Sequence, residues 1–239
     1  MLIALDAGNT RIKWGIHDGS AWVHQSAIPT AEAMQLAAVS LDWPQAAPVV
    51  ACNVAGVTVE AVIDSVVRRL GSPPRWLRSS AEACGVRSTY DYPDRLGADR
   101  WAALIGARAR FPGACLVVGA GTATTVDWLD AEGFFRGGLV LPGFDLMRRS
   151  LEHNTARLPF AEGMFCSAPR NTPDAIATGC LHAQIGAIER MYATLEDSSA
   201  LCVLTGGHAE TLETYLNIPV QRADNLVLDG LLRFAASAA

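Results

Sequence analysis

The sequence predicts an α/β protein made of two lobes of similar design, each a mixed sheet with helices. Each half of the chain opens on a short apolar pattern of strand length, MLIALD at 1–6 and ACLVV at 114–118. Each pattern runs directly into a turn of small polar residues, DAGNT at 6–10 and GAGTATT at 119–125. In both halves further strand patterns follow the turn, and helical and strand patterns then alternate. This order of elements indicates a duplication.

The first half begins with a meander of strands and continues with alternating helices and strands. After the opening strand, polar and apolar residues alternate as in half-buried strands, and the turns at GNT and DGS are short. Thr30 is a candidate N-cap for a helix of good helix formers, and Gly71 closes an amphipathic helix. The expected elements are strands at 11–19, 20–28, 47–54 and 75–79 and helices at 30–41, 58–71 and 98–111.

The second half repeats this order. Pro173 lies in the first turn of a long helix behind Asn171 and Thr172, an arrangement that favours a helix start. The expected elements are a strand, turn and strand over 114–130, strands at 133–143 and 201–207, and helices at 143–153, 173–195, 208–216 and 227–238. A division near residue 113 then gives one lobe at 1–113 and another at 114–239. We expect the ligand-binding cleft between them.

Composition excludes several classes of function. Half of the 239 residues are apolar, so the chain can bury a sizeable core. The net charge of −5 and the lack of a dense Lys/Arg run provide no basic face for a phosphodiester backbone, so we expect no nucleic-acid partner. The six cysteines form no CxxC or CxxH pair and are expected to be reduced, as in a cytosolic protein. No segment has about 18 consecutive apolar residues and no signal peptide is evident, so we expect a cytoplasmic protein that does not enter a membrane.

The first polar turn carries the groups that a nucleoside triphosphate requires. Gly8 allows backbone N–H groups to approach an anion closely, and Asn9 and Thr10 can donate to phosphoryl oxygens. Lys13 follows on the next strand, and Asp6 can position hydrated Mg²⁺. Taken alone, the same residues also fit an ordinary hairpin whose Asn and Thr satisfy the backbone of the turn.

Two further glycine-containing turns strengthen the nucleotide hypothesis. GAGTATT at 119–125 offers backbone donors and hydroxyls without charge, and LTGGHA at 204–209 places a glycine pair between a buried strand and a helix. Each could also be a plain connection between two elements. The sequence contains neither GxxxxGK[ST] nor GxGxxG, so neither a P-loop nor a Rossmann site is indicated. A phosphate site would therefore have to be assembled from both lobes.

The chain resembles the type III pantothenate kinases, also called Bvg accessory factor-like proteins. Seven blocks in the family's order carry the resemblance, namely DAGNTRIKWG at 6–15, GADRWAALIGA at 97–107, GTATTVD at 121–127, GGLVLPG at 137–143, NTARLP at 154–159, NTPDAIATG at 171–179 and TGGHA at 205–209. The resemblance implies duplicated ribonuclease H-like lobes of the actin-like ATPase class. It also implies a homodimeric transferase that uses Mg-ATP to phosphorylate pantothenate to 4'-phosphopantothenate, the first step of coenzyme A biosynthesis.

The resemblance also implies roles for individual residues. Positions that match nucleotide-binding positions of the family are Asp6, Ala7, Gly8, Asn9, Thr10, Arg11, Ile12, Lys13 and Thr122, with Asp6 associated with Mg²⁺ through water. Positions that match the pantothenate pocket are Tyr90, Gly97, Ala98, Asp99, Arg100 and Thr172, the last contributed by the partner subunit.

Asp99 is the residue that the resemblance identifies as catalytic. An alcohol becomes a good nucleophile when a carboxylate within hydrogen-bond reach accepts its proton as the O–P bond forms. Arg100 can bind the substrate's carboxylate in bidentate fashion and hold the hydroxyl in line with the γ-phosphate. The structural alternative is that Asp99 only stabilises the N-terminus of its helix and that Arg100 pairs with Asp99 or with solvent.

Gly119 departs from the family's pattern. The family's second phosphate loop usually opens with an aspartate that helps to ligate K⁺ or NH₄⁺, and glycine has no side chain to do so. The resemblance therefore implies a bound monovalent cation, but Gly119 has no side chain that could ligate it. Two other functions stay open, a nucleotide-binding regulator without turnover and a sugar or acetate kinase of the same superfamily.

Overall fold

The computed structural model describes residues 1–154, 163–195, 197 and 199–237, and the chain forms two compact units. The first unit comprises Met1–Pro112, Gly133–Phe135 and the C-terminal segment from Asn225. The second comprises Gly113–Glu132 and Arg136–Asp224. Each unit has its own core of apolar side chains.

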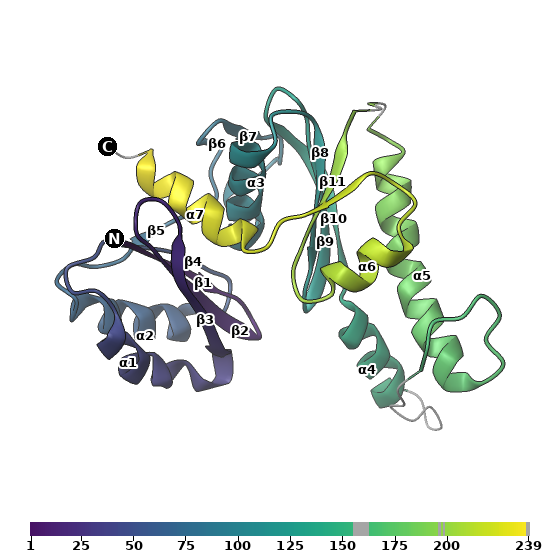
Figure 1. Cartoon of the computed structure of the whole chain (residues 1–239), viewed down its shortest axis with the longest axis horizontal. Coiled ribbons are helices and arrows are strands. Elements are labelled where there is room, and N and C mark those ends of the chain that lie inside the picture. The colour runs from purple at the N-terminus through teal and green to yellow at the C-terminus, as the bar shows by residue number, and fades with distance from the viewer. Residues whose placement is uncertain (155–162, 196, 198, 238–239) are drawn as a thin grey trace. The chain divides into compact units, whose positions relative to one another are not determined.

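The first unit is built on a five-stranded mixed sheet in the order β3-β2-β1-β4-β5. Strand β1 lies antiparallel to β2 and parallel to β4. Helices α1 and α2 cover one face of this sheet, and α3 and α7 pack on the other (Figure 1). The bounds are β1 Leu2–Ala7, β2 Arg11–His17, β3 Trp22–Pro29, β4 Val49–Asn53, β5 Arg75–Trp76, α1 Leu36–Val39, α2 Val57–Arg68, α3 Ala98–Arg110 and α7 Leu226–Ala236.

The second unit repeats the strand order of the first. Its strands follow the order β10-β9-β8-β11-β12, with β8 antiparallel to β9 and parallel to β11. Helices α5 and α6 pack on this sheet and contribute to its core, and α4 follows β10 (Figure 1). The bounds are β8 Cys115–Ala120, β9 Ala123–Leu129, β10 Phe134–Pro142, β11 Leu201–Thr205, β12 Val220–Arg222, α4 Phe144–Asn154, α5 Thr172–Tyr192 and α6 Ala209–Tyr215. The predicted fold class, two mixed sheets with helices in a duplicated order, is confirmed.

Two short strands of the first unit were not predicted from the sequence. Strand β7, Val86–Ser88, pairs with β6, Glu82–Ala83, in an antiparallel hairpin. On its other side β7 pairs in parallel with Phe134 and Phe135, the first two residues of β10. Strands of two or three residues are too short to produce a recognisable alternation of polar and apolar residues.

The helix predicted at 30–41 is wrong in detail. The segment consists of a 3₁₀ helix at Thr30–Gln35, the single turn of α1, and a second 3₁₀ turn at Ser40–Asp42. Glu32 has non-helical backbone angles, which interrupts the first of these. Good helix formers are not sufficient here, because a helix this short gains most of its stability from packing and only part of this one is buried.

Two further features concern the thiols and the helices. All six cysteines are free, and those at 52, 115, 180 and 202 are buried. Within the described part of the chain, no helix combines the length and the apolar character needed to cross a membrane.

Candidate active site

The turn after β1 is held by its backbone and by Thr30. The N–H of Gly8 donates to the carbonyl of Arg11 at 3.1 Å, and the hydroxyl of Thr30 donates to the carbonyl of Gly8 at 2.7 Å. The N–H of Thr30 donates to the carbonyl of Thr10 at 3.0 Å. Asn9 and Thr10 have exposed side chains at the tip. Backbone hydrogen bonds and the side chain of Thr30 therefore help to hold this turn.

The register of β1 and β2 decides which predicted residues could contact a nucleotide through a side chain. Lys13 is exposed and lies directly across the antiparallel pair from Asp6. Ala7 and Ile12 are fully buried in the core of the unit. Only the backbone of these two residues is therefore available to a ligand.

Asp6 is a buried carboxylate whose neighbours disturb its ionisation. Its side chain is 8% exposed, and the thiol of Cys52 on the neighbouring parallel strand donates to its Oδ1 at 3.6 Å. Burial and then the negative charge of Asp99 raise the pKa of Asp6 to about 6, whereas Lys13 and the Cys52 hydrogen bond act to lower it. Asp6 and Asp99 are distant in sequence but interact electrostatically. A buried carboxylate whose pKa is raised by burial and by a second charge is a candidate functional group.

Asp99 lies in the first turn of α3. Its Oδ1 accepts a hydrogen bond from the backbone N–H of Arg100 at 2.8 Å, and the carbonyl of Gly97 accepts the N–H of Trp101 at 2.9 Å. A Cβ atom at Gly97 would lie 2.6 Å from Oδ1 of Asp99, so glycine gives the carboxylate its space. Asp99 is therefore placed to stabilise the N-terminus of α3, as the structural alternative predicts. Its negative charge also raises the pKa of Asp6.

Arg100 and Tyr90 contact each other. The guanidinium of Arg100 donates to the hydroxyl of Tyr90 at 3.4 Å and lies 5.9 Å from the centroid of its ring. The ring of Phe135 is 5.8 Å from the same guanidinium, a contact that sequence reasoning missed. Ala98 is buried, so only its backbone could contact a substrate.

The second polar turn is tightly packed against the beginning of α4. The N–H of Gly143 donates to the carbonyl of Thr122 at 2.8 Å. A Cβ atom at Gly143 would lie 2.1 Å from the carbonyl oxygen of Gly121, so no other residue fits there without a shift. The N–H of His208, in the glycine turn before α6, donates to the carbonyl of Ala120 at 3.1 Å. The second and third glycine turns therefore meet at the end of β8, and Thr122 is exposed there.

The residues present fit a hydrated Mg²⁺ better than a metal held by protein alone. Within the described ranges, no group of three or more His, Cys, Asp or Glu side chains could hold a metal ion. Mg²⁺ in kinases keeps several waters and needs only one or two carboxylates, because substrate phosphates complete its shell. Asp6 supplies one such carboxylate beside the first turn. At Gly119, a Cβ atom would lie 2.8 Å from the hydroxyl oxygen of Thr125, so even a small side chain there needs Thr125 to move.

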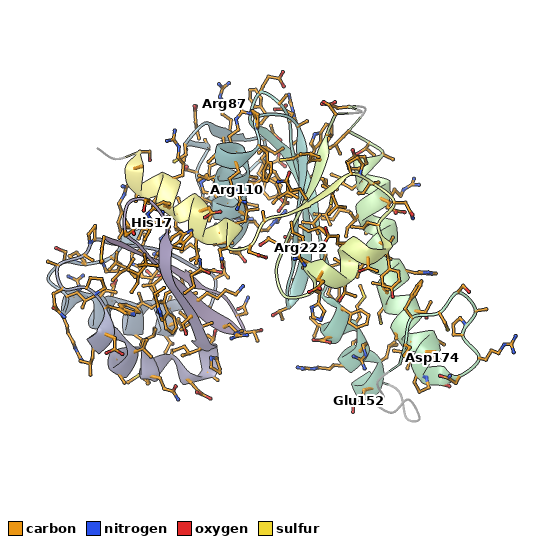
Figure 2. The ribbon with its side chains drawn as sticks, in the orientation of Figure 1. His17, Arg87, Arg110, Glu152, Asp174 and Arg222 are labelled. Atoms are coloured by element: carbon orange, nitrogen blue, oxygen red, sulfur yellow. The ribbon has the colours of Figure 1, made fainter. Side chains whose placement is uncertain are left out.

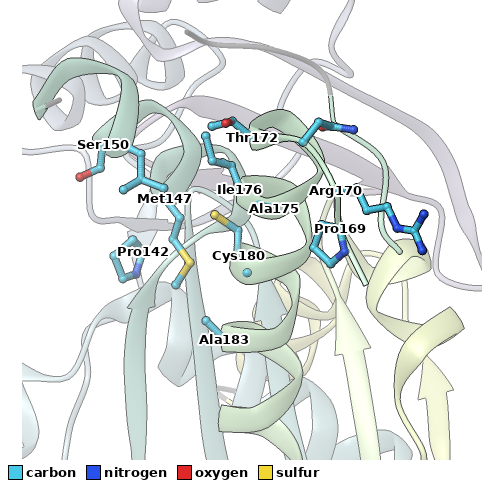
Figure 3. Close-up of a pocket in the computed structure, with 13 residues that line it drawn as sticks. Pro142, Met147, Ser150, Pro169, Arg170, Thr172, Ala175, Ile176, Cys180 and Ala183 are labelled. Atoms are coloured by element: carbon cyan, nitrogen blue, oxygen red, sulfur yellow. The ribbon is translucent and has the colours of Figure 1, made fainter. Parts of the chain in front are cut away.

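Thr172 begins α5 and lines a groove of the second unit. Asn171 caps the helix by accepting the N–H of Asp174 at 2.9 Å, which confirms the predicted helix start. The groove between α4 and α5 has a volume of about 860 Å³ (Figure 3). Besides Thr172, the side chains that line it include Met147, Leu151, Ile176 and Cys180. Residues 155–159 of the NTARLP block lie outside the described residues.

The first unit holds most of the predicted site. It contains Asp6, the first polar turn, Lys13, Tyr90, Asp99 and Arg100, whereas Thr122 and Thr172 belong to the second unit. Cys52 and Phe135 contact predicted site residues without having been predicted themselves. Both are apolar-pattern residues within strands, so no local signal distinguishes them from ordinary core residues.

Two sheets of the same strand order, each with a polar turn after its first strand, match the actin-like ATPase fold. Solved structures agree with this fold. A structure from Campylobacter jejuni that is described as a Baf family transcriptional activator superposes with a TM-score of 0.65 at 19% identity. The match covers 99% of this chain and 98% of that chain. MreB 5 of Spiroplasma citri, bound to AMPPNP, superposes with a TM-score of 0.53 at 10% identity and covers 99% and 96%.

Sequence comparison defines the family within this class. The sequence model of the type III pantothenate kinases matches residues 2–194. A type III pantothenate kinase of Aromatoleum aromaticum is 56% identical over 232 residues, which are 97% of this chain and 96% of that protein. The chain belongs to the type III pantothenate kinase family, and it is accordingly a kinase of coenzyme A biosynthesis.

Proposed function

We propose that this chain transfers the γ-phosphoryl group of Mg-ATP to the terminal hydroxyl of pantothenate, with Asp99 as the general base. The observation that carries the proposal is the electrostatic coupling of Asp99 and Asp6 within the first unit. One carboxylate belongs to the proposed acceptor side and the other to the proposed donor side. Phosphoryl transfer requires these two sides to be close.

On the donor side, the first polar turn is proposed to hold the phosphates of ATP. The backbone from Ala7 to Ile12 and the exposed side chains of Asn9, Thr10, Arg11 and Lys13 are suited to phosphoryl oxygens. Thr122 is proposed to provide a further hydroxyl. Bound Mg²⁺ neutralises charge on the phosphates, and Asp6 is proposed to hold it through water.

On the acceptor side, the residues around the start of α3 are proposed to bind pantothenate. Arg100 is proposed to pair with the substrate's carboxylate, supported by Tyr90, and the backbone of Gly97 and Ala98 lies beside them. Asp99 accepts the proton of the attacking hydroxyl while the new O–P bond forms, and ADP leaves with the electrons of the broken bond. Orientation and proton acceptance are the two contributions that these side chains supply.

Replacing Asp99 tests the proposal directly. Asp99→Asn keeps the shape and can still accept the N–H of Arg100, so we expect a folded protein with an unchanged melting temperature. Loss of a general base costs about 10²- to 10⁴-fold in turnover. A coupled assay of ADP release with pantothenate measures the loss. Asp94→Asn is the matched control, because Asp94 is exposed in the same segment and has no proposed role. Near-normal turnover by Asp99→Asn would contradict the proposal.

We also propose a cytoplasmic homodimer in which Thr172 of each copy completes the acceptor site of its partner. The support is the family resemblance, together with the exposed position of Thr172 on an apolar groove. The use of ATP fits a location inside the cell.

The cation requirement is proposed to depend on residue 119. The family resemblance predicts activation by K⁺ or NH₄⁺, whereas Gly119 predicts that no carboxylate at this position ligates the ion. Turnover in sodium-only buffer, measured with and without added K⁺, distinguishes an enzyme that K⁺ activates from one that K⁺ does not affect. Equal rates would show that the enzyme does not need K⁺.

A further inference from the structure

Phe135 lies next to Arg100, the residue proposed to bind the substrate's carboxylate. It is fully buried and belongs to the first unit, although its strand continues into the second. Parallel pairing with β7 sets Phe135 opposite Ser88. The carbonyl of Phe135 accepts hydrogen bonds from both the N–H and the hydroxyl of Thr89, at 3.1 and 2.8 Å. The backbone of Phe135 is therefore fixed next to the chain segment that carries Tyr90.

The rings of Phe135 and Tyr90 lie next to each other on the same side of the Arg100 guanidinium. Their centroids are 4.9 Å apart and the rings are tilted by 48°. The guanidinium of Arg100 is 5.8 Å from one ring centroid and 5.9 Å from the other, and it donates to the Tyr90 hydroxyl at 3.4 Å. Guanidinium groups within about 6 Å of an aromatic centroid gain a cation–π attraction. The attraction restrains the group in addition to the hydrogen bond that one of its N–H groups donates to Tyr90.

We propose that Phe135 is a positioning residue for substrate recognition, which acts through Arg100 on the carboxylate of pantothenate. The ring limits the conformations of the Arg100 side chain, so less conformational entropy is lost when the carboxylate binds. This inference rests on the proposed role of Arg100. It predicts that removal of the ring weakens the binding of pantothenate and leaves that of ATP unchanged.

The neighbouring residue provides a matched control. Phe134 pairs with Arg87, and the guanidinium of Arg87 lies 4.8 Å from its ring centroid. Because successive side chains of a strand point to opposite faces, Phe134 makes the same kind of contact on the other side of β10. Arg87, at the top of Figure 2, has no proposed role in the reaction.

The experiment compares Phe135→Met with Phe134→Met. We expect Phe135→Met to raise KM for pantothenate about tenfold, equivalent to about 1.4 kcal/mol, and to change KM for ATP and kcat less than twofold. Phe134→Met is expected to change none of these by more than twofold. Circular dichroism gives the folded fraction to which the rates are normalised. Phe135→Leu serves as a second ring-free variant where methionine folds poorly, and Phe135→Tyr, which keeps the ring, is expected to restore KM for pantothenate.

A double-mutant cycle with Arg100→Ala tests whether Phe135 acts through Arg100, with kcat/KM for pantothenate as the measured quantity. In the Arg100→Ala background, Phe135→Met is expected to have no further effect. The same tenfold loss in both backgrounds, or an equal rise in KM for ATP, would overturn the inference. If Arg100→Ala leaves kcat/KM unchanged, the proposed role of Arg100 fails as well. If Arg100→Ala reduces it while Phe135→Met behaves like Phe134→Met, only the inference about Phe135 fails.

Discussion

At the scale of single residues, Asp6 combines a proposed role in metal binding with a cost in stability. Burial removes its carboxylate from water, and the charge of Asp99 adds repulsion, so the folded protein favours the protonated form. Because the pKa of Asp6 is raised from its usual 3.8 to about 6, the contribution of its protonated form to stability is complete only below pH 3.8. The stabilisation is lost as the pH rises through about 6. The ionised carboxylate suits a hydrated cation, so binding of Mg²⁺ would offset the loss of stability that ionisation of Asp6 causes.

Asp6→Asn is therefore expected to stabilise the metal-free protein at neutral pH. The difference of about two pKa units corresponds to about 3 kcal/mol at most. The free energy of unfolding of Asp6→Asn should exceed that of the natural protein at pH 8, and the difference should shrink towards pH 4. Urea unfolding in the presence of EDTA measures both. Asp94→Asn, at an exposed position, is expected to leave this pH dependence unchanged. A constant difference between pH 4 and pH 8 would contradict the argument.

The site residues also mark where sequence reasoning succeeds and fails at this scale. Asp6 and Asn9 were predicted because short polar residues follow an apolar strand there, and Asp99 was predicted from the family resemblance. Cys52 and Phe135 were missed because each matches the apolar strand pattern around it. Their contacts with Asp6 and Arg100 depend on strand register, which a single sequence does not specify.

At the scale of elements, the packing of α7 on α3 is set by two glycines. A Cβ atom at Gly230 would lie 1.8 Å from the carbonyl oxygen of Ala102, and one at Gly106 would lie 2.2 Å from that of Leu226. The two helix backbones are therefore in direct contact. Asp229 on α7 accepts a hydrogen bond from Arg110 of α3 at 2.8 Å, and it also accepts one from the indole of Trp22 on β3 at 2.9 Å. Helix α3 also carries Asp99 and Arg100, so α7 supports the element on which the proposed acceptor site is built.

Gly230→Ala is expected to separate α7 from α3 and to destabilise the protein by about 2–4 kcal/mol, because the added methyl group meets backbone that cannot rotate away. The midpoint of urea unfolding measures the change. Gly186→Ala in α5 is the matched control, since a Cβ atom there meets nothing within 4 Å and alanine favours a helix interior by about 1 kcal/mol. Equal effects of the two substitutions would contradict the close-packing argument.

Elements with a long, regular pattern were predicted well, and short ones were not. The opening strands, α2, α3 and the capped start of α5 follow from periodicity and from Gly, Pro and Asn at their ends. The strand predicted at 75–79 is reduced to Arg75–Trp76, and Val220–Arg222 was not predicted at all. Such short strands exist because a neighbouring strand pairs with them, which is a tertiary effect.

At the scale of the whole molecule, the duplication could be predicted from the sequence and the membership of the two units could not. Two turns of similar composition after two similar strands were enough to indicate a repeat, and the strand orders agree with it. The division at residue 113 follows chain order and stays a prediction about the lobes. Chain order cannot reveal that the segment from Asn225 packs within the first unit, because the contact of α7 with α3 depends on glycines distant in sequence.

The proposed dimer leads to a prediction about mixtures of inactive copies. If Thr172 completes the site of the partner, Asp99→Asn and Thr172→Arg each abolish turnover alone, because every site contains a defect. Unfolding and refolding them together creates mixed dimers, in which one site carries both defects and the other is intact. Random pairing makes about half of the dimers mixed, so the mixture should recover about a quarter of the natural activity. If each copy used its own Thr172, every site of every dimer would keep one defect and no activity would return.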